Sequence, residues 1–246
     1  MIKTAFFTIV DDRYYYPVGT HILVNSFKRF HPDIDLIVFR QDTIDKVFTE
    51  KGINFYQTKP TFAKLLTDKY DRVINIDADT IILDRLTEVI DTDWEVGGVW
   101  NYNDYENASF DGITKQMYVQ AGMVGSTRED FWDRWEEMNL DAMKYVRQEN
   151  DVLNLVWYTQ VPDMKKLIWD KEKNYLGCKS LGREPEFYMD GKKVMCRGEQ
   201  VKAYHYARGG GAMPKMDWDR IGLTQEVKNY FNYVGMKGVT EVYGNL

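Results

Sequence analysis

The chain has 246 residues, of which 44% are apolar and 15% aromatic, so it can bury a sizeable core and is not a wholly disordered chain. Its 32 Lys and Arg residues and 38 Asp and Glu residues give a net charge of −6. This charge argues against a nucleic-acid backbone as the main partner, because binding many phosphates needs a basic surface. The length fits one domain over residues 1–246.

Cysteine usage and the N-terminus predict the cellular setting. Cys178 and Cys196 have neither the spacing of a zinc site nor the number needed for a disulfide framework, so we expect reduced thiols. The apolar run at 5–10 is too short for a membrane span, and no other stretch is long enough. We therefore expect a soluble, cytoplasmic protein with no signal peptide and no transmembrane segment.

The first hundred residues alternate between strand and helix patterns. Apolar, β-favouring stretches predict strands at 5–10, 34–39 and 73–76. Between them, apolar side chains at helical spacing predict one helix opened by Pro17 and a short one capped by Thr61. This order is typical of an α/β fold in which a mostly parallel, Rossmann-like sheet carries helices on both faces.

The remainder of the chain is less regular. The expected segments are a strand at 96–100, a polar loop or lid at 101–115, a helix after Thr127, a helix at 151–158, a loop-rich stretch at 174–214 and a last helix at 225–234.

Carboxylates follow two of the predicted strands. Asp11 comes directly after the first strand, and Asp77-Ala78-Asp79 comes after the third. Parallel strands bring their carboxyl ends to one edge of the sheet, where ligands of such folds bind. Hard oxygen ligands suit Mg²⁺ or Mn²⁺, which usually bridge to substrate phosphates. The triplet alone also suits a solvated turn, but its place after a buried strand favours a binding site.

The stretch Asp71-Arg-Val-Ile-Asn-Ile-Asp-Ala-Asp-Thr-Ile-Ile-Leu83 resembles the core motif of the glycogenin-like retaining glycosyltransferases, the family 8-like group that also holds bacterial lipopolysaccharide galactosyltransferases. Five further elements are similar to those of the family and follow in the same order, namely the first strand and base loop at 8–14, a basic residue at Lys64, and the segments 120–124, 149–154 and 203–206. The resemblance implies a single GT-A domain. Residues 1–100 would form its nucleotide-binding half, and residues 101–246 would bind the sugar and the acceptor.

The family resemblance implies a metal site and a nucleotide site. Asp77, Asp79 and His205 would bind Mn²⁺ or Mg²⁺. Of the other histidines, His21 lies in the first predicted helix and His31 in a predicted surface turn. Our candidates for binding the nucleotide-diphosphate donor, most simply a UDP-sugar, are Asp11, Tyr15 or its neighbour Tyr16, Lys64, Asp77, Arg208 and Lys215. The cations among them would offset charge on the departing diphosphate.

The resemblance also implies a sugar pocket, formed by Gln120, Glu149, Asn150 and Asp151. Gln120 stands where the family has Asn, and Glu149 and Asn150 replace Asp and Gln. The family's late His-x-x-Gly-x-x-Lys pattern is not kept after His205. These departures leave the donor sugar and the phosphate loop open. Each residue type also has a plain structural explanation, such as a helix cap at 149–151 or ordinary packing of the tyrosines.

The predicted function is transfer of a sugar from the nucleotide donor to a carbohydrate-bearing acceptor, such as a glycan, glycolipid or protein, with retention. A sugar nucleotidyltransferase is one alternative, but such enzymes begin with a Gly-rich loop after the first strand, and here no glycine precedes Gly19. A non-catalytic carbohydrate-binding protein is another alternative, whose sign would be a lost metal ligand. A transferase without its acceptor and a hydrolase would both hydrolyse the donor slowly. Product analysis in the presence of an acceptor must therefore distinguish these two kinds of enzyme.

Overall fold

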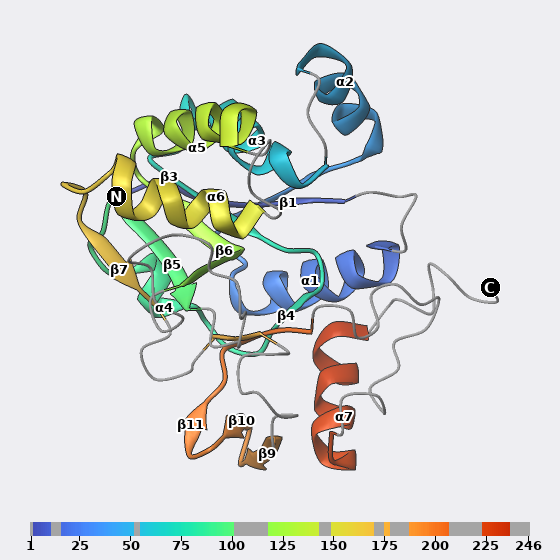
Figure 1. Cartoon of the computed structure of the whole chain (residues 1–246). Coiled ribbons are helices and arrows are strands. Elements are labelled where there is room, and N and C mark those ends of the chain that lie inside the picture. Colours follow the sequence, from blue (N-terminus) through green and yellow to red (C-terminus); the bar gives the residue numbers. More distant parts are fainter. Residues whose placement is uncertain are drawn as a thin grey trace.

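The computed structural model describes residues 2–10, 16–51, 55–100, 118–142, 149–169, 175–177, 187–206 and 223–236. Within these residues a central sheet lies between two layers of helices (Figure 1). The upper layer in Figure 1 contains α2 (Gln41–Lys51), α3 (Lys59–Thr67), α5 (Glu129–Ala142) and α6 (Glu149–Leu155), and α1 (Tyr16–Phe30) lies below the sheet. None of the helices in the described ranges is long and apolar enough to cross a membrane.

The central sheet has the strand order β2-β1-β3-β6-β5-β7. Its strands are β1 (Thr4–Ile9), β2 (Asp35–Phe39), β3 (Arg72–Ile76), β5 (Val96–Trp100), β6 (Val119–Ser126) and β7 (Lys166–Ile168). β1 pairs in parallel with β2 and β3, and β5 pairs in parallel with β7, whereas β6 is antiparallel to both of its neighbours. The predicted mainly parallel α/β sheet is therefore confirmed, with one reversed strand that the sequence did not indicate.

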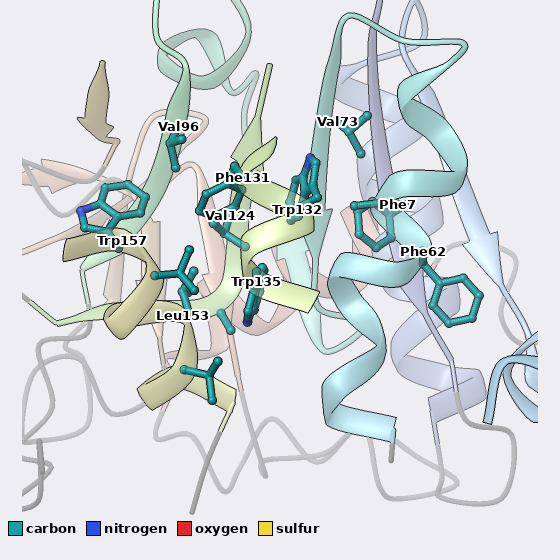
Figure 2. Packing of buried hydrophobic residues seen from close by; sticks show 14 of the residues in the cluster. Phe7, Phe62, Val73, Val96, Val124, Phe131, Trp132, Trp135, Leu153 and Trp157 are labelled. Atoms are coloured by element: carbon teal, nitrogen blue, oxygen red, sulfur yellow. The ribbon is translucent and has the colours of Figure 1, made fainter. Parts of the chain in front are cut away.

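The central sheet is buried on both faces. Successive side chains of a strand point to opposite sides, so each strand contributes to two cores. Phe7 and Val73 belong to a core with α3 and α5, whereas Phe6 and Ile74 belong to a core with α1. Figure 2 shows the first core, in which the rings of Phe7 and Trp132 have centroids 6.5 Å apart. Burial on both faces explains why the stretches that predicted these strands are mostly apolar and do not alternate strictly with polar residues.

Two small sheets lie beside the central one. The first has the order β4-β12-β8, with β4 at Thr80–Ile82, β12 at Ala203–His205 and β8 at Tyr175–Gly177. The second has the order β11-β10-β9, with β9 at Phe187–Asp190, β10 at Lys193–Cys196 and β11 at Glu199–Gln200. Side chains from both small sheets pack with α1 and α7 (Gln225–Phe231) in a third core at the lower end of Figure 1. The short helix α4 (Thr87–Ile90) follows β4.

Two predictions about local structure were wrong. The stretch 174–214 was expected to be loop-rich, yet it contains β8 to β12, whose strands are too short for a clear alternating pattern. Thr61 does not cap a helix: α3 begins at Lys59, follows a 3₁₀ turn at Phe55–Thr58, and has Pro60 in its first turn. The loop predicted at 101–115 lies outside the described residues.

Two further features went unpredicted or were misplaced. No sequence pattern indicated α2, because most of its residues are polar; among its described side chains, the buried apolar ones are Ile44 and Val47. His31, expected in a surface turn, is 1% exposed. Its ring stacks on Phe27 at 4.6 Å, and its Nε2 accepts a hydrogen bond from the Leu86 N–H at 3.0 Å.

Candidate active site

The carboxylates of the Asp-Ala-Asp motif and a distant histidine come together through backbone pairing. Asp77 follows the last residue of β3, and Asp79 precedes the first residue of β4. β12 runs antiparallel to β4 and places His205 opposite Thr80. The Tyr206 N–H donates to the Asp79 carbonyl at 3.0 Å. Strand pairing across more than a hundred residues therefore fixes where the imidazole lies.

The three side chains form a compact set of potential metal ligands. His205 Nε2 lies 3.0 Å from Asp79 Oδ1 and 3.7 Å from Asp77 Oδ2. One ligand atom from each of the three residues lies within 4.8 Å of the other two. Two carboxylates and an imidazole are a donor set that suits Mn²⁺ and also Mg²⁺. The residues predicted to bind metal are therefore close enough together to share one ion.

Within this cluster, the carboxylates and the imidazole stabilise each other's charged forms. Burial acts to lower the pKa of His205, but the Asp79 and Asp77 carboxylates outweigh it and raise that pKa above its usual value. Burial acts to raise the pKa of Asp79, but the adjacent His205 ring holds that pKa below its ordinary value. A positive charge is thus favoured between the two carboxylates, which is the electrostatic condition for a cation site.

A buried lysine that sequence reasoning missed lies at the centre of the site. Lys59 Nζ is 2.8 Å from Asp77 Oδ1 and 3.0 Å from Glu149 Oε1, and it donates to the Ala121 carbonyl at 3.0 Å. Burial alone would lower the pKa of Lys59, but the Asp77 and Glu149 carboxylates raise it well above its usual value. Lys59 opens α3, directly before Pro60, and this position gave no sequence signal for a buried charge.

Lys64, one of the three predicted phosphate-binding cations, lies further along α3. Its Nζ forms ion pairs with Asp133 Oδ1 at 2.6 Å and with Glu136 Oε2 at 2.9 Å, both on α5. These pairs join two helices on the upper face of the sheet. Lys64 is therefore not the basic residue beside the motif; the structure brings Lys59 there.

Glu149, a predicted sugar-pocket residue, is joined to the cluster through Lys59, which also pairs with Asp77. One carboxylate oxygen is paired with Lys59, and the other, Oε2, is buried with no hydrogen-bond partner in the described ranges. Burial raises the pKa of Glu149 to about 7, although Lys59 opposes the rise. A buried acceptor atom without a donor is costly. This atom is therefore suited to receive a donor from a bound ligand.

The neighbouring Asn150 supports the backbone of β6. β3 ends at Ile76, whereas β6 continues past it and leaves backbone groups without a strand partner. The Ala121 N–H donates to Asn150 Oδ1 at 2.7 Å, and the Ala121 carbonyl accepts from Asn75 Nδ2 at 2.9 Å. The side-chain oxygen Oδ1 of Asn150 therefore already accepts a hydrogen bond within the protein.

Two more side chains of α6 complete this substitute for a strand. Asn154 accepts the Val119 N–H and donates to the Val119 carbonyl, with both distances 2.7 Å. Asp151 Oδ1 accepts a hydrogen bond from the Tyr118 hydroxyl. Of the predicted sugar-pocket residues, Asn150 and Asp151 therefore hold β6 to α6, whereas Glu149 keeps a free acceptor atom.

Gln120 lies on β6 beside the histidine. Its Oε1 is 3.3 Å from His205 Nδ1, on the side of the ring away from the carboxylates. The structure thus brings together six of the predicted positions: Asp77, Asp79, Gln120, Glu149, Asn150 and His205. Asp11, Tyr15, Arg208 and Lys215 lie outside the described residues.

Comparisons with known proteins agree on the architecture. No protein-family model matches the chain, and no curated protein matches it either. The galactosyltransferase LgtC in complex with donor and acceptor sugar analogues has a TM-score of 0.55 and 17% identity, covering 92% of this chain and 99% of that chain. An active-site mutant of LgtC has a TM-score of 0.56 and 16% identity, covering 94% of this chain and 95% of that chain.

The apo bifunctional glycosyltransferase WbbM gives a TM-score of 0.56 and 14% identity. The match covers 94% of this chain but 51% of WbbM, so the chain spans about half the length of that protein and nearly all of LgtC. The chain has the GT-A fold. The GT-A fold that the family resemblance implied is therefore confirmed, and the matched structures are glycosyltransferases.

Proposed function

We propose that this GT-A protein is a metal-dependent glycosyltransferase that moves a sugar from a nucleotide-diphosphate donor, most simply a UDP-sugar, to a carbohydrate-bearing acceptor with retention. The observation that supports it best is the convergence of Asp77, Asp79 and His205 at the carboxyl end of β3. Ligands of open α/β sheets bind at this edge. A non-catalytic relative of the fold would be expected to lose at least one of these three side chains.

The residues present fit a divalent cation. The cluster offers two carboxylates and an imidazole nitrogen, and Lys59, which Asp77 shares with Glu149, offsets only part of the negative charge, so a bound cation is favoured. Mn²⁺ or Mg²⁺ held here would neutralise charge that develops on the diphosphate as the sugar–phosphate bond breaks.

The chain's own groups have separate tasks in this proposal. Lys59 pairs with the carboxylates of Asp77 and Glu149 and so holds them in a fixed relation. Its positive charge would lie near the diphosphate of a donor bound at Asp77. The free Oε2 of Glu149 would accept a hydrogen bond from a hydroxyl of the donor sugar. The donor sugar would thus lie between α6 and the end of β3.

Product analysis tests this function. We expect the protein to release nucleoside diphosphate from a UDP-sugar with Mn²⁺, and to form a product whose anomeric configuration, read by NMR, is retained. Asp79→Asn should lower the rate at least a hundredfold, because the mutation removes a carboxylate from the cation site. Asp190→Asn is the matched control, since Asp190 is exposed on β9.

The proposal would be wrong if chelator or Asp79→Asn left the rate unchanged. An alternative outcome, nucleotide exchange with a sugar phosphate and no transfer to any acceptor, would identify a nucleotidyltransferase instead.

A further inference from the structure

We propose that Gln120 is a positioning residue that holds the ring of His205 in the one tautomer able to bind metal. This inference rests on the proposed metal site, and it reassigns Gln120, which the sequence placed in the sugar pocket. The residue would act through the imidazole and would not itself touch the donor.

The two ring nitrogens of His205 face different partners. Nε2 points to the carboxylates, 3.0 Å from Asp79 Oδ1, and Nδ1 lies 3.3 Å from Gln120 Oε1. A neutral imidazole has one N–H and one lone pair, and the hydrogen bond at one nitrogen decides which nitrogen can bind metal. Nε2 can offer its lone pair to a cation when Nδ1 carries the hydrogen, and Gln120 Oε1 is placed to accept that hydrogen.

The space around the ring shows why an acceptor is needed there. A small cavity of about 10 Å³, near the volume that one water requires, borders His205 and Gln120 between β5, β6 and β12. Part of the His205 ring therefore faces a space that no side chain fills. A hydrogen bond at Nδ1 fixes the ring orientation where packing does not.

Gly122 provides the room for this pair. It lies two residues after Gln120, so both residues face the same side of β6. A Cβ at position 122 would lie 2.7 Å from His205 Nδ1 and 3.3 Å from Gln120 Oε1. Any larger residue would therefore push the ring away from both the amide and the carboxylates.

The test measures binding of Mn²⁺ alone, followed by the loss of the free-ion EPR signal, with no substrate and no turnover. Gln120→Leu keeps the approximate volume and removes the acceptor, and we expect it to raise the Kd for Mn²⁺ about tenfold or more. Gln120→Glu keeps an acceptor oxygen and should bind within about threefold of the wild type or more tightly. Gly122→Ala should weaken binding in the same direction as Gln120→Leu.

Gln200→Leu is the matched control, because its amide bonds Asp84 on another part of the fold and its loss should leave the Kd unchanged. Thermal melts of each variant establish that it is folded. A Gln120→Leu protein that binds Mn²⁺ as tightly as the wild type would overturn the inference while leaving the proposed function intact. Equal weakening in Gln120→Leu and Gln120→Glu would also overturn it, since shape and not the acceptor would then matter. Absence of Mn²⁺ binding by the wild type would refute both this inference and the metal site.

Discussion

Lys59 connects the parts of the site at the scale of single residues. Its ammonium group is buried and lies within 3.0 Å of oxygens from the end of β3, from β6 and from α6. A buried charge is tolerated when it is paired and hydrogen-bonded, and three acceptors satisfy the three N–H groups of a lysine. The lysine thereby fixes the spacing between Asp77 and Glu149 before any ligand arrives.

Replacing Lys59 with Met should destabilise the protein by about 3 kcal/mol, because it leaves two partly buried carboxylates without their shared cation. The free energy of unfolding from urea titration, without metal, measures this loss. Lys69→Met is the control: its side chain is exposed just after α3, and its loss should cost less than about 0.5 kcal/mol. Equal stability of Lys59→Met and wild type would show that the ion pairs contribute nothing net.

At the scale of elements, α6 replaces a missing strand. β6 extends beyond the end of β3. There, side-chain amides of α6 form hydrogen bonds with the β6 backbone at Val119 and Ala121. Asn150 and Asn154 are four residues apart, so they lie on one face of the helix and reach alternate residues of the strand. This arrangement also sets Glu149, which precedes Asn150, beside the metal cluster.

Asn154→Leu should lower the free energy of unfolding by about 3 kcal/mol, because it leaves the buried N–H and C=O of Val119 without partners. Asn154→Asp keeps the acceptor for the N–H and places a carboxylate against the carbonyl, so it should not restore stability. The matched change Asn229→Leu, on the exposed side of α7, should cost less than about 0.5 kcal/mol. If all three variants have the same free energy of unfolding, the hydrogen bonds of the Asn154 amide do not hold β6 in place.

The sequence predicted those elements whose signal is local. β1 and β3 are short strands of mostly apolar, β-favouring residues, and the position of Asp77 and Asp79 follows from the end of the second. The pairings β3–β6 and β4–β12 join segments about 50 and 120 residues apart, and no local pattern encodes them. For the same reason a resemblance was needed to single out His205, and Lys59 was missed, since a lysine at a helix start ordinarily points to solvent.

At the scale of the whole molecule, stability at mild acidity should depend on His31. Burial, with a smaller contribution from Arg85, lowers the pKa of His31 to about 4, although Asp33 and Asp84 oppose this. The unfolded chain takes up the proton near pH 6.5 and the folded chain near pH 4. Stability is therefore lost as the pH falls through this window, and below about pH 4 this residue causes no further change.

Between pH 7 and pH 5, we expect His31 to account for a loss of about 2 kcal/mol in the free energy of unfolding. The comparison is with His31→Gln, which does not titrate, so contributions from all other groups cancel in the difference between the two pH dependences. An equal loss in the variant and the wild type would mean that the buried ring is not the source.

The central claim is a cation site that binds a nucleoside diphosphate at the carboxyl end of β3, and calorimetric titration tests it most directly. UDP, GDP, CDP and dTDP would each be titrated with and without Mn²⁺ into wild type, Asp79→Asn and the control Asp190→Asn. The account predicts that one nucleotide, most simply UDP, binds with Mn²⁺, that binding weakens at least tenfold without the metal, and that Asp79→Asn loses it whereas Asp190→Asn does not. Binding of no nucleotide by the wild type, equal binding by the wild type with and without Mn²⁺, or unchanged Mn²⁺-dependent binding by Asp79→Asn would contradict the account.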